Sequence, residues 1–111
     1  MIEITVREFL ESAIQIPVYM EFPEDAPKSF VVLKKGDSAR SNYLDSAMFV
    51  ADSYGASLYE CAVLNEQVKA GFERLAELAC VSCVEPAGDY PAFDTTNKRH
   101  RYQAVYNITH Y

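Results

Sequence analysis

The hydrophobic pattern predicts a helix at the start of the chain. Apolar residues recur there at helical spacing, and charged residues occupy the other side. The apolar positions are Ile2, Val6, Phe9, Leu10, Ala13 and Ile14. Pro17 ends the helix because the residue before a proline is excluded from the helical conformation. A short strand over Pro17–Phe22 follows, closed by Pro23 and an acidic turn, Glu24–Pro27.

The next apolar run predicts a strand over Ser29–Lys35, which Gly36 ends. The stretch Asp37–Asp45 is polar and aperiodic, so it is predicted to be a long loop before a strand over Ser46–Tyr54. A loop of this length exceeds what a hairpin needs, and two interpretations stay open: a segment that orders against a partner, or a plain surface loop. Arginine and tyrosine are enriched at interfaces. The interaction residues predicted in this loop are Asp37, Arg40, Asn42 and Tyr43.

A second helix is marked by a capping box, Ser57–Glu60, in which the serine satisfies an orphan amide and the glutamate reaches back. Its buried stripe is predicted to be Leu58, Cys61, Val68, Phe72, Leu75 and Ala79. Acidic residues and Lys69 fill the opposite, solvated side. This is the best-marked element in the chain.

Two strands are predicted to finish the domain. The first covers Val81–Pro86 and is followed by a turn through Gly88–Pro91 and a polar bend, Asp94–Asn97. The last runs over Arg99–His110 with strict alternation, which suits an antiparallel sheet with one face on the core. The predicted order is α-β-β-β-α-β-β. We therefore expect one α+β domain over residues 1–111, with a mainly antiparallel sheet and two helices packed on one face.

Length and charge narrow the function classes. A chain of 111 residues fits one domain that holds a core without staples. Its formal charge of −6 disfavours a general nucleic-acid binder. Lys98–Arg101 is a local basic exception, interpreted as the solvated start of a strand rather than a phosphate site. No apolar run approaches the ~20 residues that cross a bilayer, and the start lacks the pattern of a signal peptide, so we expect synthesis in the cytoplasm and no membrane partner.

The cysteines raise the question of a metal or redox site. Three cysteines do not suit a disulfide framework, and the C-x-x-C of Cys80 and Cys83 would need two further zinc ligands. The remaining candidates, Cys61, His100 and His110, are irregularly spaced. The C-x-x-C segment also reads as a strand, which places its two thiols on opposite faces. We expect buried structural cysteines, with no metal and no cofactor.

Signatures of catalysis are missing from the sequence. It contains no G-x-S-x-G, P-loop, G-x-G-x-x-G or H-E-x-x-H motif, and its two histidines lie ten residues apart on one predicted strand. The interpretation is a protein that is not an enzyme and that has no catalytic residues. Aromatic side chains are plentiful, and for Tyr43, Tyr54 and Tyr111 both core packing and subunit contact stay open.

Two phrases of the sequence carry a family resemblance. The helix phrase Ser57–Val68, SLYECAVLNEQV, resembles one in small prophage proteins of Gram-positive bacteria, and so does the ending Asp94–Tyr111. Those proteins are similar to the tail-terminator or tail-completion proteins of long-tailed phages. The resemblance covers nearly the whole chain, including the opening helix and the order of elements.

The resemblance implies a structural assembly protein. It implies a ring, usually of six copies, that ends the tail tube and joins it to the head connector. The partners would be other copies of the chain, the tail tube protein and the neck proteins, in the host cytoplasm during assembly and afterwards in the tail or neck of the virion. It implies no reaction and no sequence-specific contact with nucleic acid. The alternatives are another neck or head-closure component, a small binding module, or a small enzyme of unknown substrate.

Overall fold

The computed structural model describes residues 2–41 and 44–111, with residues 37, 40 and 41 described by their backbone alone. The elements in chain order are α1 (Ile2–Ile14), β1 (Val18–Tyr19), β2 (Phe30–Ser41), β3 (Leu44–Tyr54), α2 (Leu58–Arg74), the 3-10 turn η1 (Leu75–Glu77), β4 (Val81–Asp94) and β5 (Arg99–His110). This confirms the α+β class and the predicted order α-β-β-β-α-β-β.

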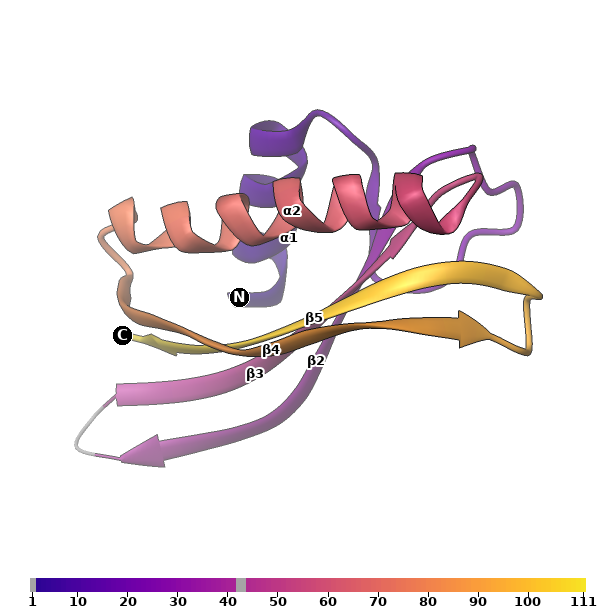
Figure 1. Ribbon diagram of the computed structural model, residues 1–111. Helices are drawn as coiled ribbons and strands as arrows, with labels where there is room; N and C mark the ends of the chain where they lie inside the picture. The colour runs from indigo at the N-terminus through magenta and orange to yellow at the C-terminus, as the bar shows by residue number, and fades with distance from the viewer. Residues whose placement is uncertain (1, 42–43) are drawn as a thin grey trace.

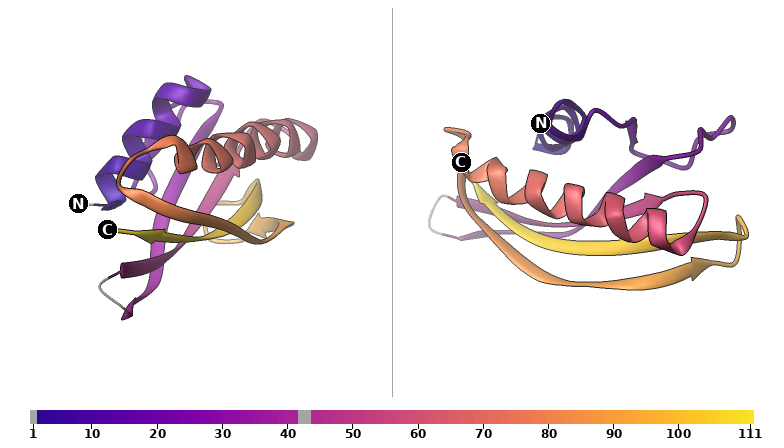
Figure 2. Two further views of the ribbon diagram at one scale, coloured as in Figure 1. Left: turned by 90° about the vertical axis from the view of Figure 1, so that its left-hand side faces the viewer. Right: turned by 45° about the horizontal axis from the view of Figure 1, so that its top comes forward.

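The strands form one five-stranded sheet in the order β1-β2-β3-β5-β4. The short β1 runs parallel to β2, and every other neighbouring pair is antiparallel. Both helices lie on the same side of this sheet, with α2 crossing over β3 and β5 and α1 beside α2 (Figures 1 and 2). The molecule is elongated, 42 × 24 × 24 Å. The other side of the sheet therefore has no helix over it.

The main core fills the space between the helices and the sheet. Alternate residues of β2, β3 and β5 point into it, because successive strand side chains face opposite sides. Phe72 of α2 stacks on Tyr106 of β5, with ring centroids 4.5 Å apart and planes 10° from parallel. The fully enclosed residues of the main core include Val6, Leu10, Val31, Leu33, Phe49, Ala51, Val68, Leu75, Ala104 and Ile108.

The opening helix is tied directly to the first strand. Gln15 adopts a left-handed φ of 55°, and its amide donates to the Glu11 carbonyl at 2.9 Å. The Glu11 carboxylate accepts from the Val18 amide, also at 2.9 Å. The predicted strand Pro17–Phe22 is shorter than expected, since only Val18 and Tyr19 pair with β2 before the chain turns away.

The second helix begins as the capping box predicts. The Glu60 amide donates to the Ser57 hydroxyl at 3.2 Å, and the Glu60 carboxylate accepts from the Ala56 amide at 2.9 Å. Four of the six predicted stripe residues are buried, namely Cys61, Val68, Phe72 and Leu75. The other two are wrong: Leu58 is 44% exposed at the helix start, and Ala79 is exposed in the turn after η1.

The long loop predicted over Asp37–Asp45 is wrong. β2 runs on to Ser41 and β3 starts at Leu44, with Ser38 opposite Ala47 and Ser41 opposite Leu44. A bulge between Lys35 and Ser38 absorbs the irregular register. The segment reads as a loop because most of its side chains are polar, which erases the alternation that a half-buried strand shows.

The turn predicted at Gly88–Pro91 is also wrong. These residues continue β4, whose register shifts between Pro86 and Gly88. Gly88 takes a φ of +128°, which is accessible to glycine and strained for other residues. Because β4 is the last strand at its side of the sheet, it tolerates the prolines and the bulge. The bend predicted at Asp94–Asn97 does form the turn into β5.

Gly71 sets the distance between the two helices and provides a test of their packing. A Cβ at this position would lie 2.9 Å from Leu10 Cδ2. Gly71→Leu is therefore expected to lower the free energy of unfolding by about 1–3 kcal/mol through overpacking, even though leucine favours helix over glycine. The exposed neighbour gives the control, Ala70→Leu, which should change stability by less than about 0.5 kcal/mol. Urea unfolding measures both, and equal stability of the two variants would contradict the packing.

Candidate interaction surfaces

The side of the sheet away from the helices carries an apolar band. We call the outward-facing residues Met48, Val50, Gln103, Val105 and Asn107 the open sheet face. Val50 lies opposite Val105, and Met48 lies opposite Asn107. Asn107 is exposed and the other four side chains are half-buried, although both helices lie on the far side of the sheet (Figure 2). Three of these five side chains, those of Met48, Val50 and Val105, are apolar, and no helix among the described residues covers them.

One end of the same side is closed by a small second core. Phe30 and Tyr54 stack with centroids 4.7 Å apart, and Phe22 packs edge-on against both rings at 5.5 Å. Val32, Tyr19 and Ala26 complete this cluster, so the connection between β1 and β2 folds over the end of the sheet. This connection covers the second core alone and does not extend over the open sheet face.

A buried carboxylate separates the second core from the open sheet face. Asp52 is fully buried, with Lys34 Nζ 3.0 Å and an Arg101 guanidinium nitrogen 3.5 Å from its Oδ2. A buried charge needs such partners, because removing one of them leaves a charge without compensation. The sequence offers one signal for this site, an aspartate in the middle of an apolar strand.

One edge of the sheet is poorly suited to adding another strand. β4 forms that edge and carries Pro86, Pro91 and the bulge at Gly88. Proline cannot donate a ladder hydrogen bond, and a bulge turns the edge away from a partner strand. Contact through the faces of the sheet is therefore favoured over contact through this edge.

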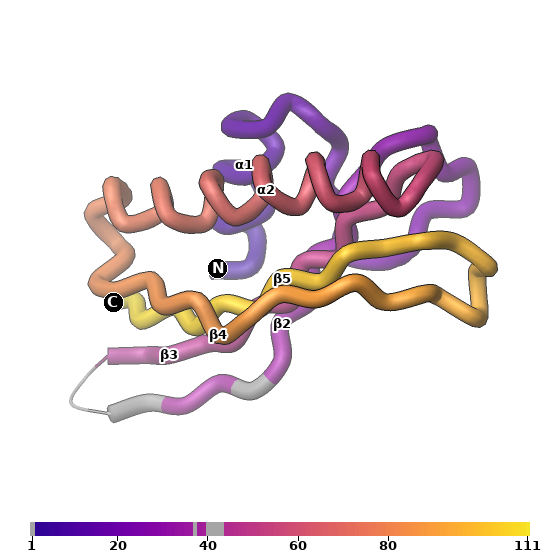
Figure 3. Tube along the Cα trace, in the orientation of Figure 1, coloured from indigo at the N-terminus to yellow at the C-terminus, as the bar shows by residue number. Residues whose placement is uncertain are grey.

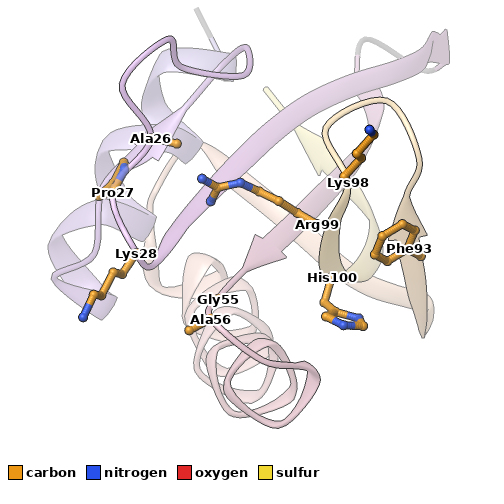
Figure 4. A pocket seen from close by; sticks show the side chains of 9 residues that line it. All are labelled: Ala26, Pro27, Lys28, Gly55, Ala56, Phe93, Lys98, Arg99 and His100. Atoms are coloured by element: carbon orange, nitrogen blue, oxygen red, sulfur yellow. The ribbon is translucent and has the colours of Figure 1, made fainter.

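Three connections lie at one end of the sheet (Figure 3), and a cleft is formed where they meet. Its volume is about 380 Å³. Ala26–Lys28 come from the β1–β2 connection, and Gly55 and Ala56 from the turn before α2. Phe93 lies at the end of β4, Lys98 in the β4–β5 turn, and Arg99 and His100 at the start of β5. We call it the basic cleft, because Lys28, Lys98, Arg99 and His100 all line it. Figure 4 shows Lys28 and Lys98 on opposite walls, with the Arg99 side chain reaching between them.

Aromatic rings hold the cleft side chains. The Arg99 guanidinium carbon lies 5.8 Å from the centroid of Phe22 and 5.6 Å from that of Phe30, within the range of a cation–π contact. His100 meets Phe93 edge to face at 5.3 Å. Arg99 is thus positioned by the second core and not by a carboxylate.

Asp94 shapes the turn that carries Lys98 and Arg99. One carboxylate oxygen accepts from the Thr96 and Asn97 amides at 3.1 and 3.2 Å, and the other accepts from the Asn97 side chain at 2.7 Å and the Tyr54 hydroxyl at 2.8 Å. Lys98 follows with a left-handed φ of 53°. Burial alone would raise the pKa of Asp94, but the hydrogen bonds from Asn97 and Tyr54 outweigh it and lower the pKa to about 2. Burial and the bond to Asp94 raise the pKa of Tyr54 to about 12.

The cations of the basic cleft lack carboxylate partners. Six Lys and Arg side chains elsewhere in the described structure lie within 4.0 Å of a carboxylate, namely Arg7, Lys34, Lys35, Lys69, Arg74 and Arg101. Among the described side chains, only Lys28, Lys98 and Arg99 make no such pair, and all three line the cleft. The basic run Lys98–Arg101 therefore does not form one group, because the Arg101 guanidinium pairs with Asp52. Lys28, from the distant β1–β2 connection, lines the cleft together with Lys98 and Arg99.

The residues predicted from the sequence as interaction sites fall near the end of the β2–β3 hairpin. Asp37 and Arg40 belong to β2, and only their backbone is described. Asn42 and Tyr43 lie outside the described residues. The hairpin replaces the loop in which these residues were expected, and their contact with a partner stays a prediction.

The cysteines do not form one buried set. Cys61 is buried, and its thiol donates to the His100 carbonyl at 3.3 Å; burial raises its pKa. Cys80 is exposed and Cys83 half-buried, so the expected burial of the C-x-x-C pair is wrong. Cys80 lies in the turn before β4, outside the strand that was expected to bury it. Over residues 2–41 and 44–111, no three His, Cys, Asp or Glu side chains are grouped to hold a metal ion, and no helix is long and apolar enough to cross a membrane.

Comparison with known proteins adds no identification. No protein-family model matches the chain, and no curated protein matches it either.

The Asp94 network makes a prediction for acid stability. The folded-state pKa of about 2 lies below the ordinary 3.8, so the stabilisation is present above pH 3.8 and is lost as the pH falls through 2. Asp94→Asn is expected to cost about 2 kcal/mol of unfolding free energy at pH 6, and the difference from wild type should shrink towards zero near pH 2. Glu24→Gln, at an exposed acid, should change little at either pH. Urea unfolding across this range measures the difference, and a constant gap would contradict the ionic role of Asp94.

Proposed function

We propose that this chain is a structural protein of a phage or prophage tail that assembles into a ring, ends the tail tube and joins it to the head connector. The resemblance of Ser57–Val68 and Asp94–Tyr111 to tail-terminator proteins supplies the class. The observation that carries assembly is the open sheet face, an apolar band with no helix above it.

The energetics of that surface favour association. Each buried Å² of apolar surface contributes roughly 25 cal/mol, and the two helices bury only one side of the sheet. The half-buried Met48, Val50 and Val105 keep apolar surface in contact with water in the single chain. Packing this surface against another copy or against the tail tube removes it from water. The prolines of β4 support face contact over strand addition.

The shape suits a ring contact. A closed ring needs a heterologous interface, in which two different patches of each subunit meet. This elongated molecule has different elements at its two ends, with the β2–β3 hairpin at one and the β4–β5 turn at the other (Figure 1). The basic cleft is lined in part by that turn. Contacts from Asp37, Arg40, Asn42 and Tyr43 to the tail tube or a neighbouring subunit belong to this proposal.

A neck or head-closure component is the second candidate. It shares every surface described above and differs in its partner. Sedimentation with purified tail tubes and, separately, with head connectors distinguishes the two, because a terminator binds the end of the tube without the head.

The open sheet face predicts which substitution blocks assembly. Val105→Glu places a charge in the apolar band and should weaken self-association or tube binding at least tenfold, since an unpaired carboxylate would have to be desolvated in the contact. The control is Val63→Glu, on the exposed side of α2, where valine is 42% exposed. It should assemble as wild type does. Light scattering, alone and with tail tubes, measures both variants, and thermal unfolding checks their folding.

The opposite outcomes are equally informative. If Val105→Glu assembles normally while Val63→Glu does not, the contact lies on the helices and not on the sheet. A wild-type chain that stays monomeric both alone and with tail tubes contradicts the assembly function itself.

A further inference from the structure

We infer that the basic cleft binds the acidic turn of a second copy of this chain, where the acidic turn means Glu21, Glu24 and Asp25. The inference rests on the proposed function, since it names two surfaces that would meet in a contact between neighbouring copies. Its basis is the distribution of unpaired charge.

Three cations lie at the cleft without a carboxylate partner, although the chain has carboxylates to spare. The sequence holds 16 acidic and 10 basic residues, so carboxylates outnumber cations. Even so, Lys28, Lys98 and Arg99 line one cleft with no carboxylate within 4.0 Å among the described residues. The cleft is therefore suited to an anionic group from outside the chain.

The matching anions lie on the connection between β1 and β2. Glu21, Glu24 and Asp25 are exposed, and within the described structure none has an ion pair or a hydrogen bond. The other carboxylate of which this holds is Glu73, on α2. Three unpaired carboxylates thus occupy one short segment, as three unpaired cations occupy one cleft.

The two sets do not neutralise each other within one molecule. Only two residues separate Asp25 from Lys28, yet no pair between the acidic turn and the cleft cations forms within 4.0 Å. Pro23 and Pro27 lie on either side of Glu24 and Asp25 and each has a fixed φ, which limits the freedom of these two residues to fold back. A second copy can approach the cleft without this restriction.

Apolar side chains beside the charges complement each other as well. Phe93 forms part of the cleft wall and is 52% exposed, while Met20 precedes the acidic turn and is 45% exposed. A methionine sulfur against an aromatic ring is a favourable contact. The Met20–Phe93 contact would give the charged interface an apolar centre, which a bare anion would not use.

The cleft and the acidic turn are different patches that share one end of the molecule. A contact between different patches is heterologous, and it continues from copy to copy. Such a contact closes into a ring when the rotation from one copy to the next divides a full turn evenly. A reciprocal pairing of two copies would give a dimer instead.

A charge swap tests this contact. The cleft variant is Lys28→Glu with Lys98→Asp, where aspartate tolerates the left-handed backbone of Lys98. The turn variant is Glu24→Lys with Asp25→Lys. Arg99 is left in place because it packs on the second core. Each variant alone sets like charges against each other and should associate at least tenfold more weakly than wild type.

Mixing the two variants restores opposite charges at every contact, so the equimolar mixture should assemble as wild type does. The matched controls change charge on α2 and η1: Arg74→Glu, and Glu73→Lys with Glu77→Lys. These exposed positions should leave association unchanged.

Native mass spectrometry gives the stoichiometry. Raising ionic strength from about 0.1 M to about 1 M, which shortens the Debye length from about 10 Å to about 3 Å, should weaken the complex.

The outcomes separate the inference from the function. If wild type assembles and either swapped variant alone assembles equally well, or the mixture is not restored, the cleft–turn contact is wrong while the assembly function stands. If the swap behaves as expected but the complex is a dimer, the contact is right and the ring is wrong. Inorganic phosphate that competes no better than chloride supports a protein carboxylate as the occupant, and phosphate that dissociates the complex at low millimolar levels contradicts it.

Discussion

The packing of α2 across β3 and β5 is the constraint on which the rest of the structure depends. Phe72 of α2 stacks on Tyr106 of β5, and Val68 of α2 is buried in the same core. These contacts place one face of the sheet against the helix. Period-2 alternation then sends the neighbouring side chains to the other face. The described residues form two α-helices, and both lie on the same side of the sheet. The open sheet face is the direct consequence of that arrangement.

Much of this architecture could be predicted from the sequence, and the exceptions have physical reasons. The capping box at Ser57 and the alternation of β5 are local signals, and both elements form where expected. The end of the β2–β3 hairpin could not be predicted from a local pattern. Its residues are mostly polar, so they lack the alternation of apolar and polar positions from which a strand is predicted. In β4, glycine and proline signal a turn in sequence, but an edge strand accommodates them as a bulge.

The interaction surfaces were harder to predict than the fold. The sequence shows Lys98–Arg101 as one basic run, whereas the fold sends Arg101 to Asp52 and brings Lys28 to the same cleft from about 70 residues earlier. Such a grouping is set by tertiary contacts that no local pattern records. The Asp94 network then fixes the turn from which Lys98 and Arg99 project. Charge pairing across the whole molecule, rather than any motif, singles out the cleft as a surface for another chain.

Electron cryo-microscopy of the purified chain mixed with tail tubes tests the central claim most directly. The account predicts a ring at one end of each tube, with the open sheet face and the basic cleft buried between neighbouring copies or against the tube. Decoration along the length of the tube, or no binding to tubes at all, would contradict it.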